Sequence, residues 1–195
     1  MNFTSEDIKK LRDQTGAGMM DAKKALQESA SFDDAVTHLR KKGHATLAKK
    51  STRTAKEGII TSYIHAGGKV GVLLELNCET DFVARNEEFK QLANEISLHI
   101  AAASPLYVSK EEVPENAIDN EKQIYTEQIK GKPANMVDQI LAGKLEKYYE
   151  QVCLLEQPYV REPDKKIKDL IAEKVGKLGE NIQVRRFTRF VLGAE

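Results

Sequence analysis

The residues of this sequence that could carry out covalent chemistry are its two cysteines and four histidines: Cys78, Cys153, His38, His44, His65 and His99. A thiol beside an imidazole forms a nucleophile–base pair, so Cys78 and His65 are the combination to consider. They fall on separate predicted strands of unknown register, and Cys78 lies in the inward-pointing phase of its strand. The histidines lack metal-ligand spacing. The sequence therefore predicts no catalytic residue, no metal site and no cofactor.

A glycine-containing stretch, GAGMM at 16–20, superficially resembles a dinucleotide-binding fingerprint. It lacks the third glycine and follows a predicted helix instead of a strand, so it fails the structural context of that motif. No GxxxxGK[ST] pattern is present. A protein without a catalytic constellation, but with apolar residues on exposed turns, is typical of a partner-binding module.

The stretch NCETDFVARNEEF at 77–89 joins a strand-like run to a helix-like one. Asp81 and Phe82 stand side by side at this junction, where neither the period of the strand nor the apolar stripe of the helix includes Phe82. Two interpretations stay open from position alone. Phe82 is either the first residue of the core or an aromatic side chain held out for a partner.

Met20 poses a similar question near the N-terminus. Met19, Ala22 and Leu26 share one stripe of a predicted helix, whereas Met20 lies about 100° away among polar residues. The sequence therefore predicts that Met20 is exposed beside lysines. It is either a stray surface methionine or a flexible apolar anchor for a partner.

Three short helices are predicted to position Met20. The patterns T-x-x-D at Thr4–Asp7 and S-x-x-D at Ser31–Asp34 are helix starts, and Gly16 to Gly18 break the chain between the first two helices. We assign residues 1–54 to this helical module. Residues 40–56 carry seven basic residues and no acid, which favours a solvated, mobile connector over a nucleic-acid patch because no aromatic residue is interleaved.

An α+β core over residues 55–195 is predicted to position Phe82. Alternation from Gly58, and from Val70 to Cys78, predicts a β-hairpin with one buried face. Asn86 is the expected N-cap of a helix over 87–103, and a further helix ends at Gly179. The run 182–192 predicts a strand that completes a small antiparallel sheet, and we favour this over RNA binding by its arginines.

A helical hairpin is predicted at about 112–152, with its link at Gly131-Lys132-Pro133. A short Gly/Pro connection between two amphipathic helices is typical of antiparallel neighbours. The apolar stripes are narrow, so the hairpin is expected to project from the body or to pair with another chain.

Composition limits the possible environments and partners. The chain has 195 residues with 30 basic and 30 acidic side chains, which gives no general attraction to nucleic acid or to an anionic membrane. No apolar run approaches the roughly 20 residues that a membrane helix needs, and the N-terminus has acids where a signal peptide needs an apolar stretch. We therefore expect a cytoplasmic protein with reduced cysteines, without a direct nucleic-acid or membrane partner.

Several segments together resemble those of bacterial elongation factor Ts, the family of guanine-nucleotide exchange factors for elongation factor Tu. The two most specific are LRDQTGAGMMDAKKAL at 11–26 and NCETDFVARN at 77–86. The other matching segments are SYIHAGGKVGVL at 62–73, KPANMVDQILAGKLEKY at 132–148, QPYVREPDK at 157–165 and GENIQVRRF at 179–187. The resemblance covers essentially the whole chain.

The resemblance implies a fold and a set of contacts. The family has a three-helix module of ubiquitin-associated type, an α+β core and a protruding helical hairpin. By resemblance, Leu11, Met19 and Met20 contact the GTPase domain of factor Tu, and His65 is a further contact. The motif Thr80-Asp81-Phe82-Val83 matches the segment that perturbs the magnesium site of the partner, with Phe82 as the wedge between its helices and Asp81 beside it.

The sequence departs from longer family members in one respect. Those members carry two similar core units, whereas this chain has a single unit with both His65 and the Thr80–Val83 motif. We therefore expect two chains to form a homodimer that binds two Tu molecules.

Overall fold

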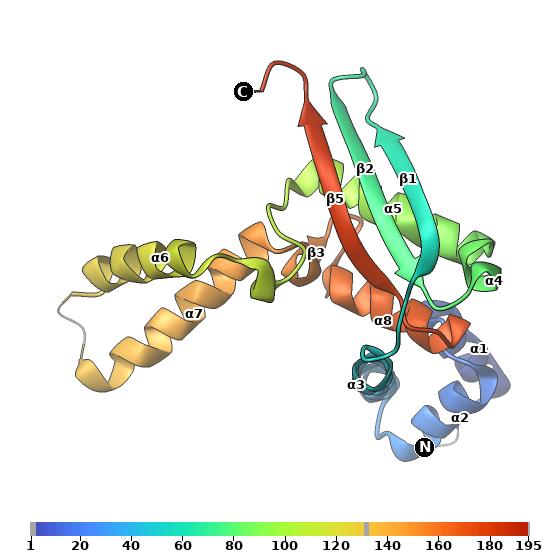
Figure 1. Cartoon of the computed structure of the whole chain (residues 1–195). Coiled ribbons are helices and arrows are strands. Elements are labelled where there is room, and N and C mark those ends of the chain that lie inside the picture. The colour runs from blue at the N-terminus through green and yellow to red at the C-terminus, as the bar shows by residue number, and fades with distance from the viewer. Residues whose placement is uncertain (1–2, 131–132, 195) are drawn as a thin grey trace.

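The computed structural model describes residues 3–130 and 133–194. In chain order the elements are α1 (Ser5–Thr15), α2 (Met19–Glu28), α3 (Phe32–Lys50), β1 (Glu57–Ile64), β2 (Val70–Cys78), α4 (Asp81–Ala84), α5 (Glu87–Ala103), η1 (Lys110–Glu112), α6 (Glu115–Gln128), α7 (Ala134–Val152), η2 (Leu154–Glu156), β3 (Pro158–Tyr159), β4 (Glu162–Lys166), α8 (Ile167–Leu178) and β5 (Gln183–Val191). The predicted α+β class is confirmed (Figure 1). Within the described ranges, no helix combines the length and apolar character needed to cross a bilayer.

Local chemistry accounts for the starts of α1 and α3 and for the end of α1. The Thr4 hydroxyl accepts a hydrogen bond from the Asp7 amide, and the Asp7 carboxylate accepts one from the Thr4 amide at 2.8 Å. The Ser31 hydroxyl caps α3 by accepting a hydrogen bond from the Asp34 amide at 3.1 Å. Gly16 ends α1 in the left-handed region at φ 67°, where glycine has no steric penalty. The module has its own apolar core, formed by Leu11, Ala22, Ala25, Leu26, Ala35 and Leu39.

The basic segment 40–56 is not the mobile connector that the sequence suggests. Helix α3 continues to Lys50 and packs against α8, with the small residues Gly43 and Ala172 in close approach. His44 Nε2 lies 2.6 Å from an Asp169 oxygen, and the Lys50 ammonium group donates to the Gly179 carbonyl. The prediction was wrong for residues 40–50 because His44 and Lys50 have hydrogen-bond partners more than a hundred positions away, which sequence patterns do not show.

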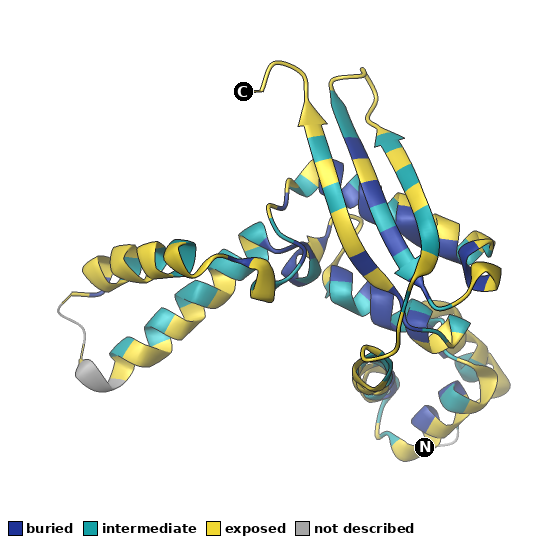
Figure 2. Cartoon of the chain, in the orientation of Figure 1, coloured by how far each residue is buried: buried dark blue, intermediate teal, exposed yellow. Residues whose placement is uncertain are grey.

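The main sheet has the order β1-β2-β5, with antiparallel pairing throughout. Its central strand β2 buries Val72, Leu74, Leu76 and Cys78, as predicted. Helices α5 and α8 lie on this face (Figure 1), and the burial colours alternate along the strands in Figure 2. Gly58 pairs with Asn77, and a side chain there would meet the Leu76 carbonyl oxygen at 2.2 Å. Only glycine therefore allows this close approach at the start of β1.

Polar contacts begin α5 and join it to the sheet and to α8. The predicted N-cap of α5 is confirmed, since the Asn86 side chain accepts a hydrogen bond from the Glu88 amide at 2.8 Å. Arg189 of β5 donates to the carbonyl of Ala101, in the last turn of α5, at 3.1–3.2 Å. Glu88 pairs with Lys177 of α8 at 2.6 Å, and its hydrogen bond to that lysine lowers the pKa of Glu88.

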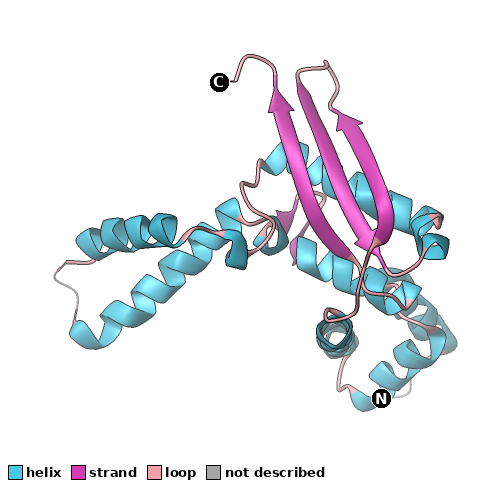
Figure 3. Ribbon diagram, viewed as in Figure 1, coloured by secondary structure: helices cyan, strands magenta, loops and turns pink. Residues whose placement is uncertain are grey.

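The predicted helical hairpin is confirmed. Helices α6 and α7 pack along each other and extend away from the sheet (Figure 3). No residue of α6 is fully buried. Gly131 and Lys132, which the sequence assigned to the link, lie outside the described residues.

His99 is a fully buried histidine in the middle of α5. Its Nε2 lies 2.9 Å from the Gln157 side-chain oxygen, and its Nδ1 accepts a hydrogen bond from the Val160 amide at 3.3 Å. This arrangement satisfies a neutral ring that carries its proton on Nε2. Burial accordingly lowers the pKa of His99, against the smaller opposing effect of the Gln157 hydrogen bond.

This geometry predicts a loss of stability in mild acid. The unfolded chain takes up a proton on His99 near its ordinary pKa of about 6.5, whereas the folded chain binds it only at lower pH. The contribution of His99 to stability is therefore complete above about pH 6.5 and falls as the pH drops toward the folded pKa. Urea unfolding at pH 7.5 and 5.5 measures this, and a His99→Gln variant should show a weaker pH dependence. An unchanged pH dependence in that variant contradicts the assignment.

Candidate functional site

The most exposed aromatic side chain of the main body is Phe82, which is 79% exposed. It lies in α4, a single helical turn between the end of β2 and the start of α5. Leaving a phenylalanine in water forgoes about 1.5–3 kcal/mol of burial free energy. Of the two interpretations that the sequence left open, the structure excludes the core position.

Caps on both sides hold this turn in place. The Thr80 hydroxyl accepts a hydrogen bond from the Val83 amide, and Asn86 starts α5 directly afterwards. Val83 and Ala84 are buried in the main core. Of the four predicted motif residues Thr80–Val83, therefore, Val83 and the Thr80 hydroxyl anchor the turn, while Asp81 and Phe82 face solvent.

A glutamate from the other end of the chain holds the same turn, and sequence patterns did not identify it. The Glu180 carboxylate accepts hydrogen bonds from the amides of Glu79 and Thr80 at 3.1 and 3.0 Å, and from the Thr80 hydroxyl at 2.6 Å. The signal that could have found it is topological. Antiparallel strands β2 and β5 place the end of one beside the start of the other.

Two ion pairs lie on and next to the turn that carries Phe82. Asp81 forms an exposed ion pair with Arg85 at 2.8 Å, and Glu79 lies 3.5 Å from Arg53 of the segment before β1. An exposed pair such as Asp81–Arg85 adds at most about 1 kcal/mol. The Asp81 carboxylate therefore has little stabilising role and remains accessible beside the aromatic ring.

Cys78 and His65 do not form a catalytic pair. Cys78 pairs with Glu57, whereas His65 follows Ile64, which pairs with Gly71. The two side chains are thus separated by roughly 25 Å of strand. Burial, with a smaller effect of the Glu180 charge, raises the pKa of Cys78 to about 11, and its thiol donates to the Thr80 carbonyl at 3.1 Å. Among the described residues, no group of three or more His, Cys, Asp or Glu side chains could hold a metal ion.

A second exposed apolar site, the methionine surface, consists of Met19 and Met20 at the start of α2. Met20 is 74% exposed, as predicted, but Met19 is also 51% exposed and does not join the buried stripe of Ala22 and Leu26. Met19 is the first residue of the helix, so no preceding turn covers it. Leu11, which the resemblance gave as a third contact with the partner, is fully buried in the apolar core of the module. Its side chain supports the module and does not itself face outward.

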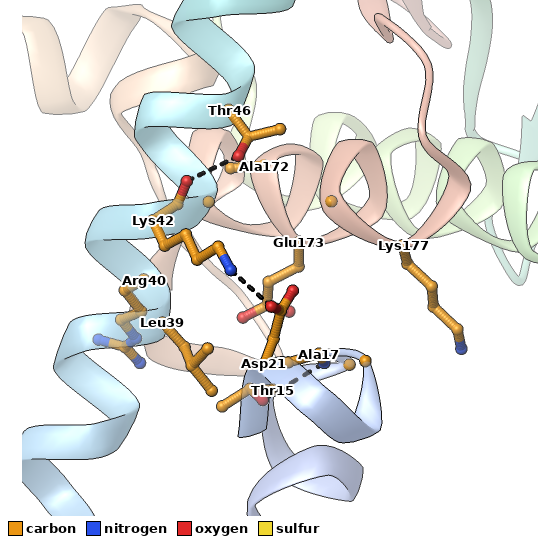
Figure 4. Close-up of a pocket in the computed structure, with 14 residues that line it drawn as sticks. Thr15, Ala17, Asp21, Leu39, Arg40, Lys42, Thr46, Ala172, Glu173 and Lys177 are labelled. Atoms are coloured by element: carbon orange, nitrogen blue, oxygen red, sulfur yellow. Dashed lines mark hydrogen bonds and ion pairs between the residues drawn. The ribbon is translucent and has the colours of Figure 1, made fainter. Parts of the chain in front are cut away.

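A cavity of about 230 Å³ lies beside the methionine surface, between the turn after α1, helix α3 and helix α8 (Figure 4). Lys42 and Asp21 form an ion pair at 2.6 Å across it. Glu173 of α8 lines the cavity, and burial raises its pKa although Lys165 lies 3.1 Å away. This cavity marks the joint at which the three-helix module meets the core.

The predicted contact residues divide between the two ends of the sheet. Phe82 follows the end of β2, and the segment from the helical module enters β1 at that same end. His65 lies in the hairpin turn at the opposite end, exposed, with its Nδ1 3.2 Å from the Tyr63 hydroxyl. A single chain therefore does not bring His65 and Phe82 into one patch.

Comparison with known proteins gives a consistent result. The family model described as Elongation factor TS matches residues 2–194. Elongation factor Ts of Thermodesulfovibrio yellowstonii is 59% identical over 99% of this chain and 98% of its own length. The protein of the same name from Thermotoga petrophila is 57% identical over 99% of this chain and 98% of its own. That from Carboxydothermus hydrogenoformans is 52% identical over 98% and 89%.

The different burial of Leu11 and Met20 predicts opposite results in stability measurements. Leu11→Ala leaves a cavity in the core of the module and should lower the free energy of unfolding by about 2–5 kcal/mol. Met20→Ala removes a solvated side chain and should change it by less than about 0.5 kcal/mol. Amide hydrogen exchange of α1 and α2 measures both, and comparable losses in the two variants contradict the exposed position of Met20.

Proposed function

This chain belongs to the elongation factor Ts family, and from that membership we propose that it binds the GDP form of elongation factor Tu in the cytoplasm and promotes GDP release. The family supports a role in nucleotide exchange during translation elongation. The observation that carries the finer proposal is the exposure of Phe82 on a turn that is capped on both sides. No bond is made or broken in this activity.

The physical task is to favour the nucleotide-free conformation of the partner. GDP in a GTPase is held largely through its phosphates, by backbone amides of the phosphate loop and by Mg²⁺. GDP and the exchange factor are both ligands of factor Tu, and their coupling is reciprocal. The exchange factor lowers the affinity of Tu for GDP as many fold as GDP lowers the affinity of Tu for the exchange factor. The factor must therefore have contacts that form only after the partner has changed shape.

Phe82 is suited to supply such a contact. Burial of its ring between helices of the partner provides about 1.5–3 kcal/mol, and only if those helices separate. Asp81 acts beside it, and the displaced helices then perturb the Mg²⁺ site and weaken the hold on the phosphates. Rebinding of GTP completes the cycle and releases the factor.

The methionine surface supplies the grip on the GTPase domain. Methionine is flexible and apolar and adapts to a partner surface. Met19 and Met20 therefore contribute affinity, while Leu11 keeps the three helices beneath them packed. Affinity and exchange are in this way assigned to different parts of the chain.

A second copy of the chain completes the assembly, giving a homodimer that binds two Tu molecules. The support comes from the sheet face opposite α5 and α8, which carries apolar side chains that are 48–76% exposed: Ile60, Ile64, Leu73, Phe190 and Leu192. Exposed apolar patches on soluble domains mark interaction surfaces, and two such sheets can pack face to face. His65 of the second copy then provides the remaining contact with the GTPase.

Replacing Phe82 tests the wedge. Phe82→Ala should leave the unfolding temperature unchanged, because the ring touches no core, and should slow GDP release from factor Tu by about ten- to a hundredfold. Asp81→Ala should have a smaller effect in the same direction. Stopped-flow release of a fluorescent GDP measures both. Normal exchange by folded Phe82→Ala excludes the wedge.

The exposed sheet face predicts the oligomeric state. Size-exclusion chromatography with light scattering at micromolar concentration should give twice the chain mass, and Leu73→Lys should give the monomer because it places a charge at the centre of the face. Val160→Lys, which changes an exposed apolar residue outside the main sheet, is the matched control. A monomeric native protein rules out the homodimer.

A further inference from the structure

We propose that Glu180 is a positioning residue for exchange, which fixes the direction in which Phe82 projects by holding Thr80. This inference rests on the proposed function of Phe82 as the wedge. Glu180 itself needs no contact with factor Tu.

The contacts between the two segments are reciprocal. Glu180 accepts hydrogen bonds from the amides of Glu79 and Thr80 and from the Thr80 hydroxyl, at 2.6–3.1 Å. In return, Glu79 accepts one from the Asn181 amide at 2.7 Å. Hydrogen bonds to a charged carboxylate are stronger than those between neutral groups. Thr80 is at the same time the N-cap of α4, so Glu180 acts on the residue that sets the start of the turn.

Rigid elements hold Glu180 on both sides. Gly179 ends α8 in the left-handed region at φ 81°, and Asn181 and Ile182 are fully or almost fully buried before β5 begins. The carboxylate is therefore fixed relative to the core. Helix α4 has only one turn and is too short to be stable by itself, so its orientation depends on such external contacts.

The orientation of Phe82 matters because ordering a mobile side chain on binding costs conformational entropy. That cost would reduce the net free energy that burial of Phe82 supplies for opening the partner. A side chain that is already held in its bound direction avoids that loss. Loosening of the turn should therefore lower the rate at which the bound factor expels GDP, while the methionine surface continues to supply affinity.

The segment that contains Glu180, residues 179–183, also holds the chain where it leaves the helical module. The Asn181 side chain donates to the Arg53 carbonyl at 2.8 Å, and Gln183 donates to the Ser51 carbonyl at 3.1 Å. Arg53 in turn approaches Glu79 at 3.5 Å. Residues 179–183 thus hold both the exposed turn and the residues that follow α3 against one end of the sheet.

Two substitutions at Glu180 separate positioning from charge. Glu180→Ala should reduce the maximal rate of GDP release at saturating factor by about tenfold and change the half-saturating concentration by less than about twofold. Glu180→Gln should stay within about threefold of the native rate, because its amide oxygen can accept from both backbone amides and its amino group can donate to Thr80. Glu87→Ala, an exposed glutamate paired only with Lys90 among the described residues, is the matched control and should be unchanged.

A double variant distinguishes this proposal from the function on which it rests. If Glu180 acts through Phe82, adding Glu180→Ala to Phe82→Ala should change the release rate by less than about twofold. Native protein that does not accelerate release refutes the exchange function itself. If the native protein does accelerate release, two outcomes refute the positioning role. One is a Glu180→Ala variant that is as fast as the native protein, and the other is an equal loss of rate in Glu180→Ala and Glu180→Gln.

Amide hydrogen exchange in the free protein provides a readout without factor Tu. Glu180→Ala should raise the exchange of Thr80, Val83 and Ala84 while that of the central residues of β2 stays the same. If Glu180→Ala does not fold, Thr80→Val removes the hydroxyl, and with it both the hydrogen bond to Glu180 and the cap on the Val83 amide. This variant should also lose maximal rate at an unchanged half-saturating concentration. Native maximal rates in Thr80→Val then overturn the proposal.

Discussion

The antiparallel pairing of β2 with β5 is the constraint on which the rest of the structure depends. It joins residues about a hundred positions apart in sequence and places the end of β2 beside the start of β5. The exposed turn, the end of α8 and the segment that leaves α3 all meet at this end of the sheet. Without that pairing, α4 would be a single helical turn on an unsupported loop, and Phe82 would have no defined direction.

Helix caps and buried residues support the elements that carry the exposed apolar side chains. Phe82 lies between two helix caps and is followed by the buried Val83 and Ala84, and Met20 lies in a module whose core contains the fully buried Leu11. Each exposed side chain forgoes burial free energy in the free protein. The well-packed residues beneath offset this loss, so that the apolar groups remain available to a partner without loosening the fold.

The two faces of the sheet differ in how far they are covered. One face packs against α5 and α8 and contains the main core, while the other carries apolar side chains without a cover among the described residues. The Glu75–Arg186 ion pair at 2.7 Å lies on that open face. This face combines apolar area with one ion pair, a composition that fits the homodimer proposed above.

Local chemistry in the sequence determined the elements and the exposed residues. Caps at Thr4, Ser31 and Asn86, alternation in β2 and the isolated position of Met20 all depend on neighbours within a few residues, so their prediction succeeded. Met19 was misjudged because a helical stripe does not show that the first residue of a helix has no preceding turn to cover it. The basic segment 40–50 was misjudged because partners of α3 come from distant parts of the chain. Only the tertiary structure brought Glu180 to Thr80 and separated His65 from Cys78. Contacts between strands depend on register and topology, and short-range sequence patterns do not specify which distant residues the fold brings together.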